Sequence, residues 1–120
     1  MQAACLDSLG RFTCVKTKIA RLWRGRTAAT EDADAYVELL TTKVLPELRG
    51  IKGHRAAYLL RREIEDGTEF VVMTLFDSID AVRAFAGEDY EVANVSPEAR
   101  RLLSSFDRTA VHYETVVEPG

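Results

Sequence analysis

The sequence predicts a ferredoxin-like α+β fold, a four-stranded antiparallel sheet with its helices on one face. The first observation is the order of segments, which is strand, helix, strand, strand, helix, strand, as in split βαβ units. The second is the segment 69–77, a strand that is apolar on both faces. Its two sets of side chains are Phe70, Val72, Thr74 and Phe76 against Val71, Met73 and Leu75. A chain of 120 residues has helices for one face only, so a second copy is expected to cover the other.

The first half of the chain has the pattern of a strand, a helix and a second strand. Residues 18–27 alternate without a clean polar face, which is typical of a strand that is partly covered on both sides. Thr30 is expected to cap a helix whose apolar side chains recur at three-and-four spacing, and Pro46 to kink or interrupt its last turn. The second strand is expected over residues 54–64.

The second half begins with a hairpin. Residues 65–67 end in Asp-Gly, a strong signal for a tight turn into the strand 69–77. Asp77 or Ser78 then caps a short helix that stops at Gly87, and an irregular crossing follows over residues 88–95.

The last segments are a helix and a strand. Ser96 and Pro97 have the sequence of a helix start, with proline at the first helical position. The apolar face of this helix is expected to comprise Ala99, Leu102, Leu103 and Phe106. A final strand is expected over residues 107–117, which completes the sheet.

The N-terminal residues fit no element of this fold. Residues 1–17 make a poor signal peptide and are interpreted as a disordered or loosely packed extension of a domain that spans residues 18–117. A translation start assigned upstream of the true one would give the same pattern. Cys5 and Cys14 lack metal-ligand spacing. A disulfide between them would link only residues of this extension, and the simpler interpretation is two reduced thiols in a cytoplasmic protein.

Charge and hydropathy exclude two classes of partner. The formal net charge is -3 and the isoelectric point is about 5.4, and no basic patch is present that would neutralise phosphates. Nucleic acid is therefore not an expected partner. The longest uncharged run, residues 70–76, is too short to span a bilayer, so no membrane insertion is expected.

Motifs for the commonest cofactors are also missing. The chain has no Gly-rich phosphate loop, no Cys or His metal cluster and no Gly-x-Ser-x-Gly. A dinucleotide, a zinc ion and a serine nucleophile are therefore not encoded in a recognisable form, and no cofactor is expected.

The candidate catalytic residues are His112 and Tyr90. His112 lies mid-strand, where an imidazole could be a general base, although lone strand histidines more often have a structural role. Tyr90 lies in the irregular crossing, and loops of this kind often close over pockets. His54, at the loop before the second strand, is either a site residue or a solvated surface histidine.

Aromatic side chains supply the candidate substrate-binding set. Trp23 is suited either to wall a flat ligand or to seal an interface between sheets, because both need its bulk and its N–H donor, and packing in the core or at the interface is the favoured interpretation. Tyr58 offers a phenolic hydroxyl. Phe76, Phe85 and Phe106 are expected in the core first and as pocket lining second.

Five stretches carry a family resemblance: residues 19–25, 53–62, 76–87, 106–108 and 112–114. With these, residues 18–117 resemble the antibiotic biosynthesis monooxygenase family, within the dimeric α/β-barrel superfamily. The resemblance implies a homodimer in which two sheets pack face to face. It also implies a cofactor-independent monooxygenase for a small aromatic or quinone-type substrate. For that reaction the hypothesis from this sequence is that His112 is the base and that Tyr90 and Trp23 orient the ring.

Two other functions remain open at this point. One is a non-catalytic dimeric barrel that binds a small molecule or a protein. The other is haem binding or degradation, which the resemblance ties to a histidine early in the second long helix and to an asparagine. Residues 78–87 contain no histidine, and Asn94 is the only asparagine in the chain, so the sequence departs from that pattern.

Overall fold

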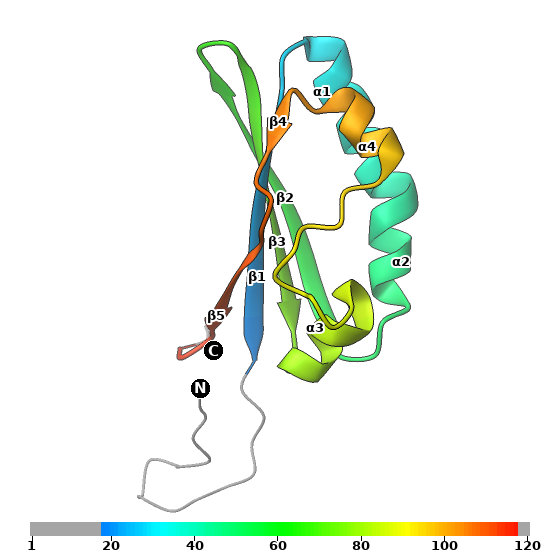
Figure 1. Ribbon diagram of the computed structural model, residues 1–120, viewed down its shortest axis with the longest axis vertical. Helices are drawn as coiled ribbons and strands as arrows, with labels where there is room; N and C mark the ends of the chain where they lie inside the picture. The colour runs from blue at the N-terminus through cyan, green and yellow to red at the C-terminus, as the bar shows by residue number, and fades with distance from the viewer. Residues whose placement is uncertain (1–17, 118–120) are drawn as a thin grey trace, which may run out of the picture.

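The computed structural model describes residues 18–117 and confirms the predicted α+β fold (Figure 1). The extension 1–17, with Cys5 and Cys14, lies outside the described residues. The elements in chain order are β1 (Ile19–Thr27), α1 (Thr30–Leu39), the π-helical turn η1 (Leu40–Val44), α2 (Leu45–Arg49), β2 (His54–Ile64), β3 (Gly67–Phe76), α3 (Ile79–Ala86), α4 (Pro97–Leu102), β4 (Ser105–Phe106) and β5 (Val111–Glu114).

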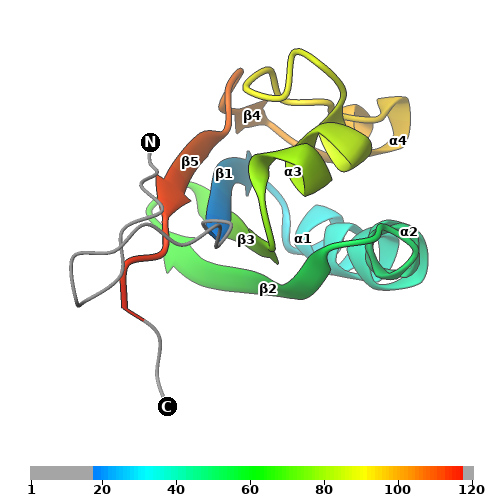
Figure 2. The ribbon, with the colours of Figure 1, turned by 90° about the horizontal axis from the view of Figure 1, so that it is seen from below.

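The sheet is antiparallel throughout, with β1 and β3 at its centre. The order is β2-β3-β1, and β4 and β5 both pair with the free side of β1. Two short strands thus share the fourth position, so the sheet has five strands where the sequence predicts four (Figure 2). The helices lie on one side of the sheet, as expected.

The predicted last strand over 107–117 is wrong in its start and its continuity. Beyond β4, Asp107 still donates its backbone N–H to the carbonyl of Arg24 in β1 at 3.0 Å, and residues 108–110 then turn toward the irregular crossing. Ala93 donates its backbone N–H to the carbonyl of Arg108 at 2.8 Å, and Ala110 donates to the carbonyl of Glu91 at 2.8 Å. These bonds satisfy the backbone groups that would otherwise extend the pairing with β1. Phe106, expected on the helix face, lies in β4.

The first helix is interrupted before Pro46, as predicted. The N–H of Leu45 bonds to the carbonyl of Leu40, five residues back, and the chain forms η1. Proline has no N–H, and its ring clashes with the carbonyl four residues earlier, so the wider turn accommodates it. The predicted cap is wrong by one residue, because Thr30 is already helical and Ala29 is the N-cap, without a side-chain bond.

None of the helices between residues 18 and 117 has the length and apolar content to cross a membrane.

The two later helix starts and the hairpin agree with the sequence. The hydroxyls of Ser78 and Ser96 accept from the N–H groups of Ala81 and Ala99, at 3.3 and 3.2 Å. At the hairpin, β3 begins at Gly67 with φ at +145°. A Cβ there would lie 2.0 Å from the carbonyl oxygen of Thr27, so this turn requires glycine.

The core lies between the inner face of the sheet and the helices. Around Phe70, which is fully buried, the cluster includes Trp23, Tyr36, Leu40 and Leu103. A second cluster, near the other end of the sheet, consists of Ile19, Leu48, Phe76, Ala81 and Val82. Each large apolar side chain buried in this way stabilises the fold by about 1.5 to 3 kcal/mol. These two clusters attach the helices to the sheet.

The outer face of the sheet is apolar and lacks a covering helix (Figure 1). Strand register puts Met73 of β3 between Leu22 of β1 and Tyr58 of β2 on this face. Four large apolar side chains here are about half exposed: Tyr58 (49%), Leu60 (50%), Val111 (49%) and Tyr113 (56%). An apolar surface of this extent is typical of an interaction site.

Candidate functional site

A cavity with two adjoining lobes lies between the inner face of the sheet and the helices. The inner lobe, of about 100 Å³, has aromatic walls that include Trp23, Tyr36 and Phe85. The outer lobe, of about 260 Å³, adds the polar side chains of Lys43, Glu47 and Glu98. Residues common to both lobes are Arg21, Leu39, Val44, Phe85, Asn94 and Ser96. An apolar chamber with a few polar groups and a polar mouth is the usual form of a small-molecule site.

Arg21 is the charged group of the inner lobe. It lies on the inner face of β1 and is only 9% exposed. Its Nη2 donates to the carbonyl of Tyr90 at 3.3 Å, and its guanidinium carbon lies 5.6 Å from the centre of the Phe85 ring. Its Nε is buried without a hydrogen-bond partner. Burial lowers the pKa of Arg21 from its usual value, although an arginine remains protonated at neutral pH.

His112 lies beside Arg21 and packs against Tyr90. Residues 21 and 112 are opposed across β1 and β5, and the His112 ring meets the Tyr90 ring edge-on at 5.1 Å between centres. Both ring nitrogens of His112 are buried without a hydrogen-bond partner. Burial and then the charge of Arg21 lower the pKa of His112, against a smaller opposing effect of Glu91. The imidazole is therefore neutral at pH 7 and chemically able to accept a proton.

His112 and Tyr90 do not line either lobe. Tyr90 belongs to the crossing between α3 and α4, and Arg21 bonds to its backbone carbonyl. A ligand confined to these lobes therefore does not contact His112 in this conformation.

Trp23 is fixed as a wall of the inner lobe. Its Nε1 donates to the carbonyl of Asp107 at 2.7 Å, which satisfies the only polar atom of the indole. Phe106 packs against it, with ring centres 6.0 Å apart, and does not itself line the cavity. Trp23 is thus part of the buried cluster around Phe70, in agreement with the expected core packing, and it also lines the inner lobe.

The remaining candidates are His54, Phe76, Phe85 and Tyr58, and of these only Phe85 lines the cavity. His54 packs edge-on against Phe76 at 5.7 Å, and Phe76 is fully buried in the second core cluster. Phe85 connects this cluster to the cavity, because it is 6.0 Å from Phe76 and lines both lobes. Tyr58 is on the outer face of the sheet, so it cannot line this cavity.

The sequence-based search missed Arg21, Asn94 and Ser96. Asn94 and Ser96 lie in and after an irregular segment, where periodicity gives no orientation. Arg21 could have been found from the sequence. Together with Ile19 and Trp23 it occupies every second position of β1, and it therefore lies on the same, core-facing side of the strand, where a charge is unusual. A buried charge without a carboxylate partner is a functional-site candidate in its own right.

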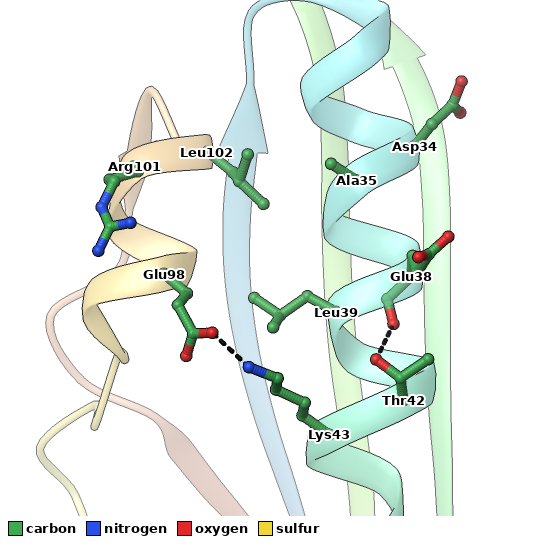
Figure 3. A pocket seen from close by; sticks show the side chains of 9 residues that line it. All are labelled: Asp34, Ala35, Glu38, Leu39, Thr42, Lys43, Glu98, Arg101 and Leu102. Carbon is green, nitrogen blue, oxygen red and sulfur yellow. Dashed lines mark hydrogen bonds and ion pairs between the residues drawn. The ribbon is translucent and has the colours of Figure 1, made fainter.

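A shallow groove of about 550 Å³ leads along the helices to the outer lobe (Figure 3). It runs between α1 with η1 on one side and α4 on the other. Lys43 forms an ion pair with Glu98 across it, and both residues also line the outer lobe. The hydrogen bond from Lys43 lowers the pKa of Glu98. This solvent-exposed pair spans the mouth of the cavity, and exposed pairs of this kind are weak enough to open readily.

Comparison with known proteins gives a family model and several similar folds. The model for antibiotic biosynthesis monooxygenase matches residues 26–93. A Bacillus cereus structure described as a candidate antibiotic biosynthesis monooxygenase is 16% identical, with a TM-score of 0.59 over 87% of this chain and 98% of that chain. A monooxygenase of Streptomyces coelicolor in complex with nanaomycin D is 22% identical, with a TM-score of 0.55 over 87% and 94%.

A haem-degrading protein of Mycobacterium tuberculosis has the same fold. It is 14% identical, with a TM-score of 0.55 over 88% of this chain and 98% of that chain. No curated protein matches the chain. At these identities the solved structures establish the fold, and one fold can carry different chemistries.

Proposed function

Because the chain belongs to the antibiotic biosynthesis monooxygenase family, we propose that it is a cofactor-independent monooxygenase for a small phenol- or quinol-type aromatic compound. The observation that carries this proposal is the aromatic-walled cavity between sheet and helices, with a neutral histidine beside it. In this reaction the substrate supplies the electrons. One atom of O₂ enters a ring carbon as a carbonyl, and the other leaves as water with the hydrogen of that carbon and the hydrogen of the phenolic hydroxyl.

The proposed roles follow from the positions of the side chains. Trp23 and Phe85 hold the flat ring, and the apolar walls exclude water from the carbanion or phenolate that reduces oxygen. His112 accepts the proton that forms this anion, after the Tyr90 segment has moved aside. Arg21 supplies positive charge close to both, which favours the anionic form of the substrate.

The test is oxygen uptake with anthrone and a series of substituted hydroquinones. We expect saturable uptake by the wild-type protein, and a loss of at least about 100-fold in His112→Ala, since a general base contributes that much or more. Because the pKa of His112 is lowered, the rate should hold at pH 7 and fall only below about pH 6.5. The melting temperature of His112→Ala serves as the control for folding. No uptake with any of these compounds, or full activity in His112→Ala, would exclude this function.

A second copy of the chain is the proposed cover for the outer face of the sheet. The face is apolar at its centre, around Met73, and charged at one end, where Arg62 donates to Glu69 at 2.8 Å. This is the composition of a protein interface, an apolar centre with a polar rim. Two antiparallel sheets that pack in this way bury both apolar faces about a two-fold axis.

A non-catalytic binding protein is the second candidate. Two observations on His112 favour it: both ring nitrogens are buried, and the residue does not line the cavity. Ligand binding without oxygen uptake would support this alternative.

The residues present do not fit haem. Asn94 does line the cavity, but neither of the two histidines of the chain does, so an axial histidine is missing there. Within residues 18–117, no group of three or more His, Cys, Asp or Glu side chains is placed to hold a metal ion.

A further inference from the structure

We propose that the ligand of this cavity is an aromatic carboxylic acid, and that Arg21 selects it by pairing with its carboxylate. The inference deepens the proposed function, since it concerns the same cavity and names the substrate class. It rests on the burial of Arg21, on its missing counter-charge and on the shape of the two lobes.

The burial of Arg21 is not offset by a charge of the protein. The side chain is 9% exposed, and none of the ion pairs in the described part of the chain includes it. Its hydrogen bond to a backbone carbonyl, at 3.3 Å, is long and neutral. A guanidinium removed from water is stabilised fully only by an anion. A ligand with a negative charge would supply that anion.

The geometry of the guanidinium suits a carboxylate. Arginine presents its N–H groups in a planar fork that matches the two oxygens of a carboxylate. Of the five N–H groups of Arg21, the structure pairs only one, from Nη2, with a protein acceptor among the described residues, and the side chain lines both lobes, so terminal N–H groups remain for a ligand in the cavity. Carboxylates are ionised at pH 7 whereas phenols are not, so the charge is present before any proton transfer.

The walls around Arg21 suit an aromatic ring. Phe85 lies under the guanidinium and lines both lobes, and Trp23 and Val72 line the inner lobe. The lobes, of about 100 and 260 Å³, admit a small ring system together with its substituents. Asn94 and Ser96, also shared by both lobes, offer neutral hydrogen bonds to hydroxyl groups on the ring. The acidic side chains of the cavity, Glu47 and Glu98, line the outer lobe only.

The test is calorimetric titration with 4-nitrobenzoate and with 4-nitrobenzamide, which have the same planar shape and differ in charge. For the wild-type protein at pH 7 we expect the carboxylate to bind at least about 30-fold more tightly than the amide, the effect of a charge-assisted hydrogen-bond pair. In Arg21→Gln this ratio should fall below about 3. Arg21→Lys should give an intermediate ratio, because it keeps the charge and loses the fork.

The control variant is Arg49→Gln, which removes an exposed arginine of α2 and should leave the ratio unchanged. Equal affinity for the two ligands, a carboxylate preference that survives in Arg21→Gln, or no binding of 4-nitrobenzoate would overturn the inference. The outcome is separable from the proposed function. If 4-nitrobenzoate binds in an Arg21-dependent way but no compound causes oxygen uptake, the inference is supported and the monooxygenase function is contradicted. If uncharged phenols cause oxygen uptake and the carboxylate is not preferred, the monooxygenase function is supported and the inference is contradicted.

Discussion

Met73→Asp is expected to convert the protein from a dimer into a monomer. Met73 lies at the centre of the outer face, between Leu22 and Tyr58, where the proposed second copy packs. An aspartate there places one unpaired carboxylate from each copy in an apolar interface, at about 3 to 5 kcal/mol each. Dimerisation then weakens by more than about 100-fold. Light scattering should give a mass near 13.4 kDa for the variant and twice that value for the wild-type protein.

The matched control for this experiment is Val92→Asp. Val92 is 55% exposed and lies in the crossing between α3 and α4, away from the outer face of the sheet. The Val92→Asp substitution introduces the same charge at another exposed apolar residue and should leave the dimer intact. Circular dichroism should show that both variants fold. A Met73→Asp protein that keeps the mass of the wild-type dimer would contradict the proposed packing of the sheets.

Phe70→Ala is expected to lower the free energy of unfolding by about 3 to 5 kcal/mol. Phe70 is fully buried, its ring is 4.9 Å from that of Tyr36, and the guanidinium of Arg61 lies 5.7 Å from its centre. Truncation removes the apolar contact between β3 and α1 and leaves a cavity that the strand cannot close. The loss is a large fraction of the about 5 to 15 kcal/mol that stabilises a typical domain.

Urea denaturation at one fixed protein concentration measures this loss, because the stability of a dimer depends on concentration. Phe70→Leu should cost less than Phe70→Ala, since it restores most of the volume. Val92→Ala, at an exposed position, should change the free energy of unfolding by less than about 0.5 kcal/mol. A cost below about 1 kcal/mol for Phe70→Ala would show that this ring does not anchor the first helix to the sheet.

Elements with local signals were predictable from the sequence. The two serine caps, the Asp-Gly hairpin and the interruption before Pro46 each depend on a few neighbouring residues, and each is present in the structure. The alternation in 69–77 also divided the side chains correctly into two faces, because Phe70, Thr74 and Phe76 are buried together; which face meets the helices was not predictable from it. Short-range chemistry determines these features, so one sequence is enough to find them.

Features that depend on distant segments were not predictable. The interruption of the last strand comes from backbone bonds between residues 91–93 and 108–110, two segments without a periodic pattern. The cavity is likewise assembled from β1, the first helix, α3 and the crossing. The sequence identified Trp23 and Phe85, which line it, through their aromatic character. It could not place Tyr58 on the opposite face of the sheet, because that depends on strand register.

The central claim is that an aromatic ligand binds between the sheet and the helices, against Trp23. Trp23 is the only tryptophan of the chain, so its fluorescence, excited where tyrosine does not absorb, reports on this wall alone. Titration with 4-nitrobenzoate, which quenches indole emission on contact, should quench Trp23 saturably, with the dissociation constant that calorimetry gives. Calorimetric binding without a change in Trp23 emission would place the ligand elsewhere and contradict this account.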